Sequence, residues 1–284
     1  MKTSPFLSDK EVKERFLQEF IKPHFRGVKV PLLAEPQTKN YALVGTAFDY
    51  LLRFYLQHLN PKAVARPWVA ETAVLMLEGH PWAHKKAKII RDNARNHLEE
   101  YLVTGEISNK LLNSTILLAK LDSYSRVGIV DEAMDKVDNR DVDDLSNLLA
   151  AVPETFTAKE TCILNPTFGE ASSMMGGADA DLIIDDVLID IKTTKHLKFS
   201  RVEFNQIINY YVLYRIAGVD GLSQEHEIKK LGIYFSRHGY LHTVDVEEII
   251  DENKFPAFVD WFKKKAADSR KSLKNHSKSA KTKR

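Results

Sequence analysis

The chain is very poor in cysteine, because Cys162 is the only one among its 284 residues. A single thiol excludes, within one chain, a disulfide framework, a zinc site built from several cysteines and a cysteine-ligated iron–sulfur cluster. The sequence also lacks any run of roughly 18 uncharged apolar residues, which a membrane-spanning helix needs. We therefore expect no iron–sulfur cluster and no membrane partner.

The amino-terminal residues MKTSPFLSDKEVKERF become charged at once and lack the apolar core of a secretory signal. The phosphate-binding loop G-x-x-x-x-G-K-[ST] is absent as well, so any ATP-driven partner would be another chain. Hydrophobic residues make up 44% of the sequence and charged residues 28%, as in a soluble globular protein. These features predict a cytoplasmic protein.

The net charge of +2 conceals an asymmetry. Residues 263–284 hold ten Lys or Arg and one Asp, a net +9, which leaves −7 for the rest of the chain. This segment has few apolar residues, so its composition predicts disorder beyond the first turn or two. Two roles are open for it: a solubilising tail, or a basic arm attracted to phosphates with an affinity that falls steeply with salt.

Helical and strand-like patterns divide the chain after residue 152. Apolar spacing and end signals predict helices at 8–21, 41–59, 67–78, 82–103, 106–126 and 141–152. The next segments read as strands at 160–168, 180–184 and 187–192, a helix at 200–219, a second hairpin and a closing helix. We therefore predict an α/β protein, with a mainly helical lobe over 1–152, an α/β core over 153–262 and a basic tail over 263–284.

The stretch ADADLIIDDVLIDIKTTK carries charges at regular positions in an apolar, β-branched background. Its two apolar runs can pair around a tight turn at Asp185-Asp186. In that register Asp181 faces Asp190, and Asp179 faces Lys192, all on one side of the hairpin. Directly opposed carboxylates about 4.5–5.5 Å apart repel each other, so stability alone does not account for the pattern.

A divalent cation would remove this repulsion. Two carboxylates and a nearby main-chain carbonyl are the oxygen ligands that Mg²⁺ prefers, so the pattern predicts Mg²⁺ or Mn²⁺ held by Asp181, Asp190 and the carbonyl of Ile191. Lys192, ~6.6 Å along the strand from Asp190, is placed to lower the pKa of a water or to neutralise charge on a scissile phosphate. The alternative is an edge hairpin whose charged side chains face water.

These residues resemble the PD-(D/E)XK nuclease superfamily, through Asp181 followed after eight residues by Asp190-Ile-Lys192-Thr193. The next predicted helix carries Gln206-Ile-Ile-Asn-Tyr210, which resembles the Q-x-x-x-Y motif of the RecB-like exonuclease branch. The resemblance implies a restriction-endonuclease-like mixed β-sheet core flanked by helices. It also implies metal-dependent hydrolysis of nucleic acid, with Gln206 and Tyr210 supporting the catalytic Asp181, Asp190 and Lys192.

The helix predicted at 41–59 contains Gly45-Thr-Ala-Phe-Asp49, where the same branch often has G-x-x-x-H with a metal-binding histidine. Aspartate also binds Mg²⁺ or Mn²⁺, so Asp49 is a further candidate ligand. An ion pair with Arg53, four residues on, is an equal alternative. Asp122 and Arg126 have the same spacing, which is typical of a structural ion pair. Many members of the branch hold an iron–sulfur cluster on four cysteines, and this chain cannot.

Four other charged residues have open roles. Glu160 and Glu170 flank the first predicted strand, and surface exposure is favoured over service as an additional acid. Asp179 shares the face of the predicted site, or only pairs with Lys192. Arg237 lies at the predicted tip of the second hairpin, and we interpret it as a turn residue, although contact with a phosphate backbone is the other possibility.

The sequence thus predicts a divalent-metal-dependent nuclease that hydrolyses phosphodiester bonds without a covalent intermediate. DNA is the expected substrate, in repair, recombination or defence against foreign DNA. A variant of this hypothesis keeps the same chemistry but makes the chain one subunit of a repair or defence complex with protein partners. The alternative is a non-catalytic nucleic-acid-binding or scaffolding module that retains the nuclease fold.

Overall fold

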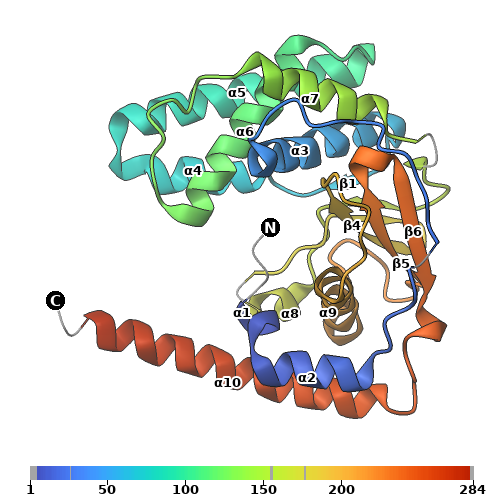
Figure 1. Cartoon of the computed structure of the whole chain (residues 1–284). Coiled ribbons are helices and arrows are strands. Elements are labelled where there is room, and N and C mark those ends of the chain that lie inside the picture. Colours follow the sequence, from blue (N-terminus) through green and yellow to red (C-terminus); the bar gives the residue numbers. More distant parts are fainter. Residues whose placement is uncertain (1–4, 26, 154–155, 176, 282–284) are drawn as a thin grey trace.

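The computed structural model describes residues 5–25, 27–153, 156–175 and 177–281. The fold is mixed α/β: a helical lobe lies on one face of an open six-stranded sheet, and further helices cover the other face (Figure 1). Within the described ranges, no helix has both the length and the apolar character needed to cross a membrane.

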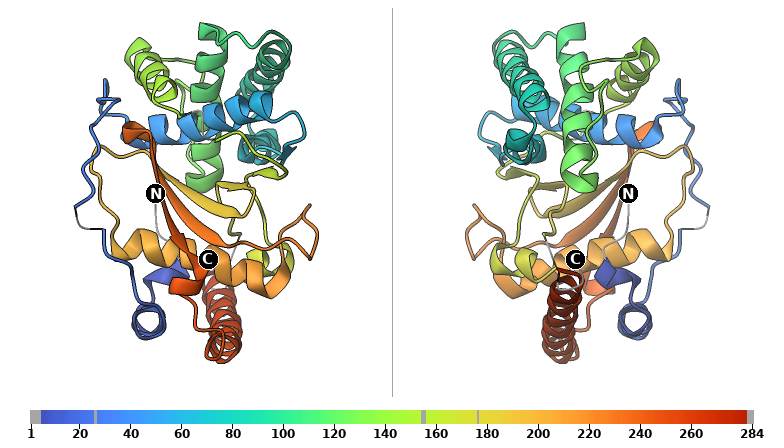
Figure 2. Two further views of the ribbon diagram at one scale, coloured as in Figure 1. Left: turned by 90° about the vertical axis from the view of Figure 1, so that its right-hand side faces the viewer. Right: turned by 90° about the vertical axis from the view of Figure 1, so that its left-hand side faces the viewer.

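The helical lobe agrees well with the predicted pattern. Its elements are α3 (Tyr41–Leu59), α4 (Val69–Met76), the short η1 (Leu77–Gly79), α5 (Pro81–Thr104), α6 (Asn109–Val127) and α7 (Asn139–Ala150). The longest apolar face, that of α3, is stopped at Asn60-Pro61 as predicted, because proline cannot continue a helix. α3 packs against α6 and α7 and brings the lobe down onto the sheet (Figure 2).

The sheet follows the chain order β1 to β6. Its strands are β1 (Val64–Ala65), β2 (Cys162–Leu164), β3 (Leu182–Ile184), β4 (Val187–Lys192), β5 (Lys230–Phe235) and β6 (Tyr240–Asp245). β1 pairs with β2 and β4 with β5 in parallel, and the other neighbours are antiparallel. The parallel step from β4 to β5 needs a crossover, which α9 (Arg201–Ala217) makes on the face opposite the lobe (Figure 1).

The predicted register of the first hairpin is confirmed, since Leu182 pairs with Ile189 and Ile184 with Val187. Asp185 adopts a positive φ of 49° in the turn, a conformation that aspartate tolerates better than most residues. Its carboxylate accepts the main-chain N–H groups of residues 159–161, so it fastens the turn to the segment before β2. The role of Asp185 is therefore structural.

Side chains point alternately to the two faces of the strands, so each strand contributes to two separate cores. Leu182 and Ile189 belong to the core between the sheet and the lobe, whereas Ile183 and Leu188 face α9 on the other side. A strand buried on both faces reads as a continuous apolar run, which explains the sequence LIIDDVLI. An acidic residue in such a strand is therefore forced into a buried position.

The boundary predicted at residue 152 needs correction, because both ends of the described chain pack together. α1 (Pro5–Ser8) and α2 (Lys10–Glu19) lie on the α/β core, not in the helical lobe. Phe16 and Phe20 make edge contacts with Phe258 of α10 (Phe255–Lys281). The N-cap of α2 is Asp9, whose side chain accepts the N–H of Val12 at 3.1 Å.

The predicted disorder after residue 263 also needs correction, because α10 continues as a helix to Lys281. Pro256 lies in its first turn, where proline leaves no hydrogen bond unmade. The sequence from 257 onward has neither glycine nor proline, and its many lysines and alanines favour a helix. The remaining short elements are α8 (Gly169–Met174), η3 (Ser236–His238) and η4 (Val246–Glu248).

Arg237 ties the second hairpin to the helical lobe. Its side chain is only 1% exposed and donates to both carboxylate oxygens of Asp144 on α7, at 2.7 and 3.0 Å, and to the carbonyl of Ala34 at 3.1 Å. A phosphate backbone cannot reach it, so the role of Arg237 is structural. The turn packs so tightly that a Cβ at Gly239 would lie 2.4 Å from the carbonyl oxygen of Ala151.

We expect Arg237→Met to lower the free energy of unfolding by about 3–5 kcal/mol, because it leaves Asp144 buried without its partner. The double variant Arg237→Met/Asp144→Leu should recover much of this loss, since it removes both charges. Urea denaturation measures the three proteins side by side. A loss below about 1 kcal/mol in the single variant would contradict the pairing.

Candidate active site

The charged residues of the first hairpin gather where β4 ends. Asp190 and Lys192 project from the face of β4 that carries Leu188, toward α9. Asp190 is completely buried at 0% exposure, and the Lys192 side chain is 13% exposed. β4 and β5 run parallel and are both covered by helices, so this carboxylate lies at the edge of a buried sheet.

Asp181 reaches this position in a different way from the predicted one. Strand pairing with β4 stops at Leu182, so Asp181 does not lie opposite Asp190 in the ladder. Its main chain turns toward the end of β2, where its carbonyl accepts the N–H of Asn165 at 2.9 Å. Its carboxylate instead accepts the N–H of Ile191 at 2.5 Å. The side chain thus replaces the main-chain acceptor that a longer β3 would have provided.

Asp179 is not opposite Lys192. It forms an isolated antiparallel bridge with Thr167, beyond the end of β2. Its charge still raises the pKa of Asp49 and that of Arg126. Asp179 therefore lies at the margin of the charged cluster and is not the partner of the lysine.

A chain of polar contacts links the strand to α9. Lys192 Nζ lies 2.5 Å from Asp190 Oδ2 and donates to Gln206 Oε1 at 3.0 Å. Gln206 Nε2 donates in turn to the Tyr210 hydroxyl at 2.9 Å. Because lysine can only donate, the contact fixes which end of the Gln206 amide faces it. The structure therefore links four of the five site residues of the two sequence motifs in one chain of contacts.

Two buried carboxylate oxygens near the end of β4 have no partner among the described residues. Asp190 Oδ2 is engaged by Lys192, but buried Asp190 Oδ1 has no hydrogen-bond partner among the described residues. The same holds for Asp49 Oδ1. Buried polar atoms without a partner are rare, because each costs free energy. A cation beside these oxygens would remove that cost.

The donor atoms at the end of β4 fit a hard divalent cation, since all are oxygens. They are the carboxylates of Asp181 and Asp190 and the carbonyl of Ile191, which points to the same side of the strand as the N–H bound by Asp181. In the part of the chain that the structure describes, no cluster of three or more His, Cys, Asp or Glu side chains has a metal-binding arrangement. The oxygen ligands available at the end of β4 are thus two carboxylates and one carbonyl.

The pKa values of the cluster are strongly displaced. Burial raises the pKa of Asp181 well above its ordinary value, and the negative charges of Asp190 and Asp49 raise it further. Burial also raises the pKa of Asp190, against the opposing effect of Lys192. Burial alone would lower the pKa of Lys192, but the two aspartates outweigh it and the net shift is upward. Such displaced groups gather preferentially at functional sites.

Tyr210 closes the α9 side of the cluster. Its ring stacks on Phe168 with 6.2 Å between centroids. Burial, followed by the charges of Asp190 and Asp181, raises the pKa of its hydroxyl well above the ordinary value. Tyr210 is therefore a neutral hydrogen-bonding group, and it holds Gln206 rather than taking part as a base.

Asp49 approaches from the helical lobe. α3 passes close to the end of β4, where a Cβ on Gly45 would lie 3.6 Å from Thr193 Cβ. Asp49 Oδ2 lies 2.5 Å from the guanidinium of Arg53, so the predicted ion pair forms. The Asp49 side chain is still 26% exposed. Burial raises the pKa of Asp49, and Arg53 opposes the shift.

The structure adds a polar layer behind Asp49. The Tyr50 hydroxyl bonds to Asp122 Oδ2 at 3.3 Å, and Arg126 Nε lies 2.5 Å from Asp122 Oδ1. The predicted Asp122–Arg126 pair is thus confirmed, and its negative end also raises the pKa of Asp49. The i, i+4 spacing predicts the pair, but no pattern in the sequence connects α6 to α3.

Glu203 is a neighbour of the cluster that the sequence interpretation missed. It closes a capping box at the start of α9, where its carboxylate accepts the N–H of Ser200 at 2.8 Å. Its charge raises the pKa of Asp190 and of Lys192. The signal was present, because Glu203 stands three residues before Gln206 and so shares its helix face. Glu160 and Glu170 are exposed, as favoured.

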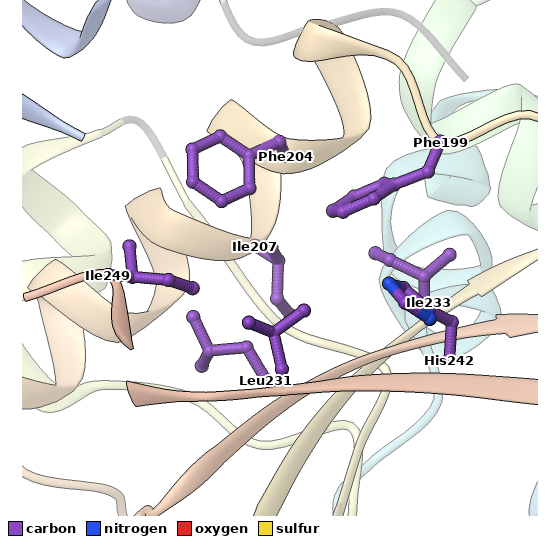
Figure 3. Close-up of a pocket in the computed structure, with 8 residues that line it drawn as sticks. Phe199, Phe204, Ile207, Leu231, Ile233, His242 and Ile249 are labelled. Carbon is purple, nitrogen blue, oxygen red and sulfur yellow. The ribbon is translucent and has the colours of Figure 1, made fainter. Parts of the chain in front are cut away.

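The other side of α9 offers no comparable site. An apolar gap separates it from β5 and β6, and Figure 3 shows the side chains around it. They fill it too closely to admit a water molecule, and its lining consists of Phe199, Phe204, Ile207, Leu231, Ile233, His242, Val244 and Ile249. Burial lowers the pKa of His242, which is half-buried.

Comparison of the chain with protein-family models, with curated proteins and with solved structures gives no match in any of the three.

We expect Asp181→Asn to raise the free energy of unfolding at pH 7 in the absence of metal. The raised pKa of Asp181 means that the folded state disfavours its charged form, so the wild type loses stability as the pH rises above the ordinary value of the carboxyl. The difference between the proteins should vanish near pH 3, where both states are protonated. Chemical denaturation in a chelator from pH 3 to 8 tests this, and an equal difference at every pH would contradict it.

Proposed function

We propose that the chain is a divalent-metal-dependent nuclease of the PD-(D/E)XK type, which hydrolyses phosphodiester bonds in nucleic acid, with DNA as the expected substrate. The observation that carries the proposal is the buried Asp190, with one oxygen on Lys192 and the other without a partner, beside the second carboxylate of Asp181. Burying two like charges beside an ammonium costs stability unless a ligand offsets it. Repair, recombination or defence are the proposed settings, alone or with protein partners.

Asp181, Asp190 and the carbonyl of Ile191 would hold Mg²⁺ or Mn²⁺, with Asp49 as a further candidate ligand. Such a cation would polarise the phosphate and lower the pKa of a bound water. The hydrogen bond from Ile191 N–H keeps Asp181 directed at the end of β4. Arg53 neutralises part of the charge of Asp49, which limits the repulsion among the three carboxylates.

Lys192 acts in this proposal as a fixed cation. Its raised pKa keeps it protonated at neutral pH, so it donates hydrogen bonds and does not serve as the general base. A protonated amine beside the scissile phosphate would orient the attacking water and stabilise the charge that develops on the phosphoryl oxygens. Gln206 and Tyr210 are positioning residues, because they hold Lys192 Nζ through one continuous hydrogen-bonded chain.

We expect Lys192→Ala to reduce Mg²⁺- or Mn²⁺-dependent cleavage by at least about 100- to 1000-fold, the usual cost of removing a group that stabilises transition-state charge. Binding of nucleic acid should persist. Labelled linear and circular substrates, single- and double-stranded, measure both. Lys195→Ala is the matched control, because this exposed lysine lies three residues further on and should keep full activity.

Removing Lys192 leaves Asp190 buried without its ion pair, so circular dichroism and thermal melting must accompany the assay. Lys192→Arg is a second variant that keeps the positive charge but replaces the compact ammonium with a planar group. It should fold like the wild type and still cleave poorly. Wild-type cleavage by either variant in a clean preparation would rule out the proposed mechanism.

The second candidate is a non-catalytic nucleic-acid-binding or scaffolding module, favoured by the strongly basic α10 (Phe255–Lys281), which can act without the cluster at β4. Calorimetric titration with Mn²⁺ separates the two. We expect the wild type to bind the ion, Asp190→Asn to lose this binding, and Asp49→Asn to weaken it only about tenfold, because Arg53 already occupies one oxygen of Asp49. Equal titrations for all three proteins would favour the module.

A further inference from the structure

α10 (Phe255–Lys281) extends well beyond the part of the protein that it stabilises. A helix of 27 residues is about 40 Å long. In Figure 1 it runs along the base of the molecule beside α2 and then continues past α8, away from the body. Among the residues whose side chains the structure describes, Ala266 is the last buried one on this helix. Between Ala267 and Lys271, α10 therefore has no buried side chain.

One face of α10 accounts for its packing. Phe255, Phe258, Phe262 and Ala266 recur at spacings of three and four residues and are all buried. Lys265 lies at the edge of this same face and is paired there, with Asp9 at 3.3 Å and Glu11 at 2.6 Å. This lysine fastens α10 to α2.

The opposite face of α10 is basic and lacks such pairing. At 100° per residue, Lys263, Lys264, Arg270 and Lys271 fall on the side away from the buried phenylalanines, and all four are exposed. Within the described residues, Lys263, Lys264 and Arg270 form no ion pair, and Lys271 lies 3.8 Å from an equally exposed aspartate. The sequence places three more lysines, at 274, 278 and 281, at the same helical phase.

These seven positions lie within an arc of about 120° and span about 27 Å along the axis. A cavity of about 340 Å³ adjoins the root of this face, between α8 and α10, and is lined by Met174, Ala266, Ala267, Arg270 and Lys271. Arg270 and Lys271 thus border open space.

We propose that the basic face of α10 is an arm that binds the phosphate backbone of nucleic acid, separate from the cluster at β4. The inference rests on the proposed nucleic-acid substrate and names the element that holds it. Nucleic acid carries a regular line of negative charge, and a line of exposed cations displaces the counterions bound to it. The rest of the chain, at −7, would repel such a substrate.

The composition of the face favours this partner over two others. A membrane-binding helix needs large apolar side chains beside its basic ones, but the large apolar residues of α10 whose side chains the structure describes pack against the α/β core. Binding of unpaired bases normally uses aromatic side chains as stacking platforms, and the basic face has none. Contacts of Lys and Arg to phosphates give affinity without sequence preference.

The full-length variants Lys263→Gln/Lys264→Gln/Arg270→Gln and Lys274→Gln/Lys278→Gln/Lys281→Gln test the arm. The matched control is Lys85→Gln/Lys88→Gln/Lys110→Gln, which removes three exposed positive charges from α5 and α6. Fluorescence anisotropy measures binding to a labelled duplex of about 30 base pairs in a chelator, at several salt concentrations. Cleavage is measured separately with Mn²⁺ at saturating protein.

Each α10 variant should weaken duplex binding at least tenfold and reduce the slope of log affinity against log salt by about 3, one for each lost contact. The control should match the wild type. Unchanged binding by both α10 variants would overturn the arm while leaving the nuclease proposal intact. If the wild type binds the duplex through α10 but does not cleave it, the arm is supported and the nuclease proposal is refuted. Binding of the same variants to anionic phospholipid vesicles is measured in parallel. If the α10 variants lose binding to the vesicles but keep binding to the duplex, the partner is a membrane and the proposed nucleic-acid arm is overturned.

Discussion

The ion pair between Lys192 and Asp190 is the constraint around which the rest of the core is arranged. Both residues lie on a strand that is covered by helices on both sides, so neither charge can be hydrated in the ordinary way. Breaking such a pair is costly, whereas forming it gains little over apolar side chains of the same size. The hydrogen bond from Lys192 to Gln206 and the neighbouring Asp181 thus surround a pair that stability alone does not favour. This imbalance is the physical ground for assigning a function to the end of β4.

The contact that holds the helical lobe to the sheet lies near the candidate site. Arg237 and Asp144 form a completely buried pair between the second hairpin and α7, close to where β5 ends. That pair fixes the helical lobe against the sheet, and α3 then carries Asp49 toward the end of β4. The helical lobe therefore contributes Asp49 to the candidate site.

Sequence patterns predicted the parts of this arrangement that depend on local spacing. The register of Leu182 with Ile189 follows from the alternation of apolar residues and a two-residue turn, and the shared face of Gln206 and Tyr210 follows from helical geometry. The patterns failed where a side chain replaces main chain or reaches across the fold. Asp181 accepts a main-chain N–H because β3 ends early, and Arg237 is buried because α7 places an aspartate beside it. The partner of Asp181 lies ten residues away in the sequence, and the partner of Arg237 lies 93 residues away.

The cluster at β4 and the helix α10 carry charges of opposite sign, and their proposed functions differ accordingly. The cluster at β4 is acidic, and the chain before α10 carries a net negative charge, so a polyanion gains nothing by approaching it unaided. A cation at Asp190 would correct the field only locally, because exposed charges are screened beyond about 8 Å at physiological ionic strength. A helix about 40 Å long with one basic face supplies attraction over a much greater length of substrate. In this arrangement affinity comes from α10 and chemistry from β4, so salt should affect the binding of substrate far more than the reaction of substrate already bound.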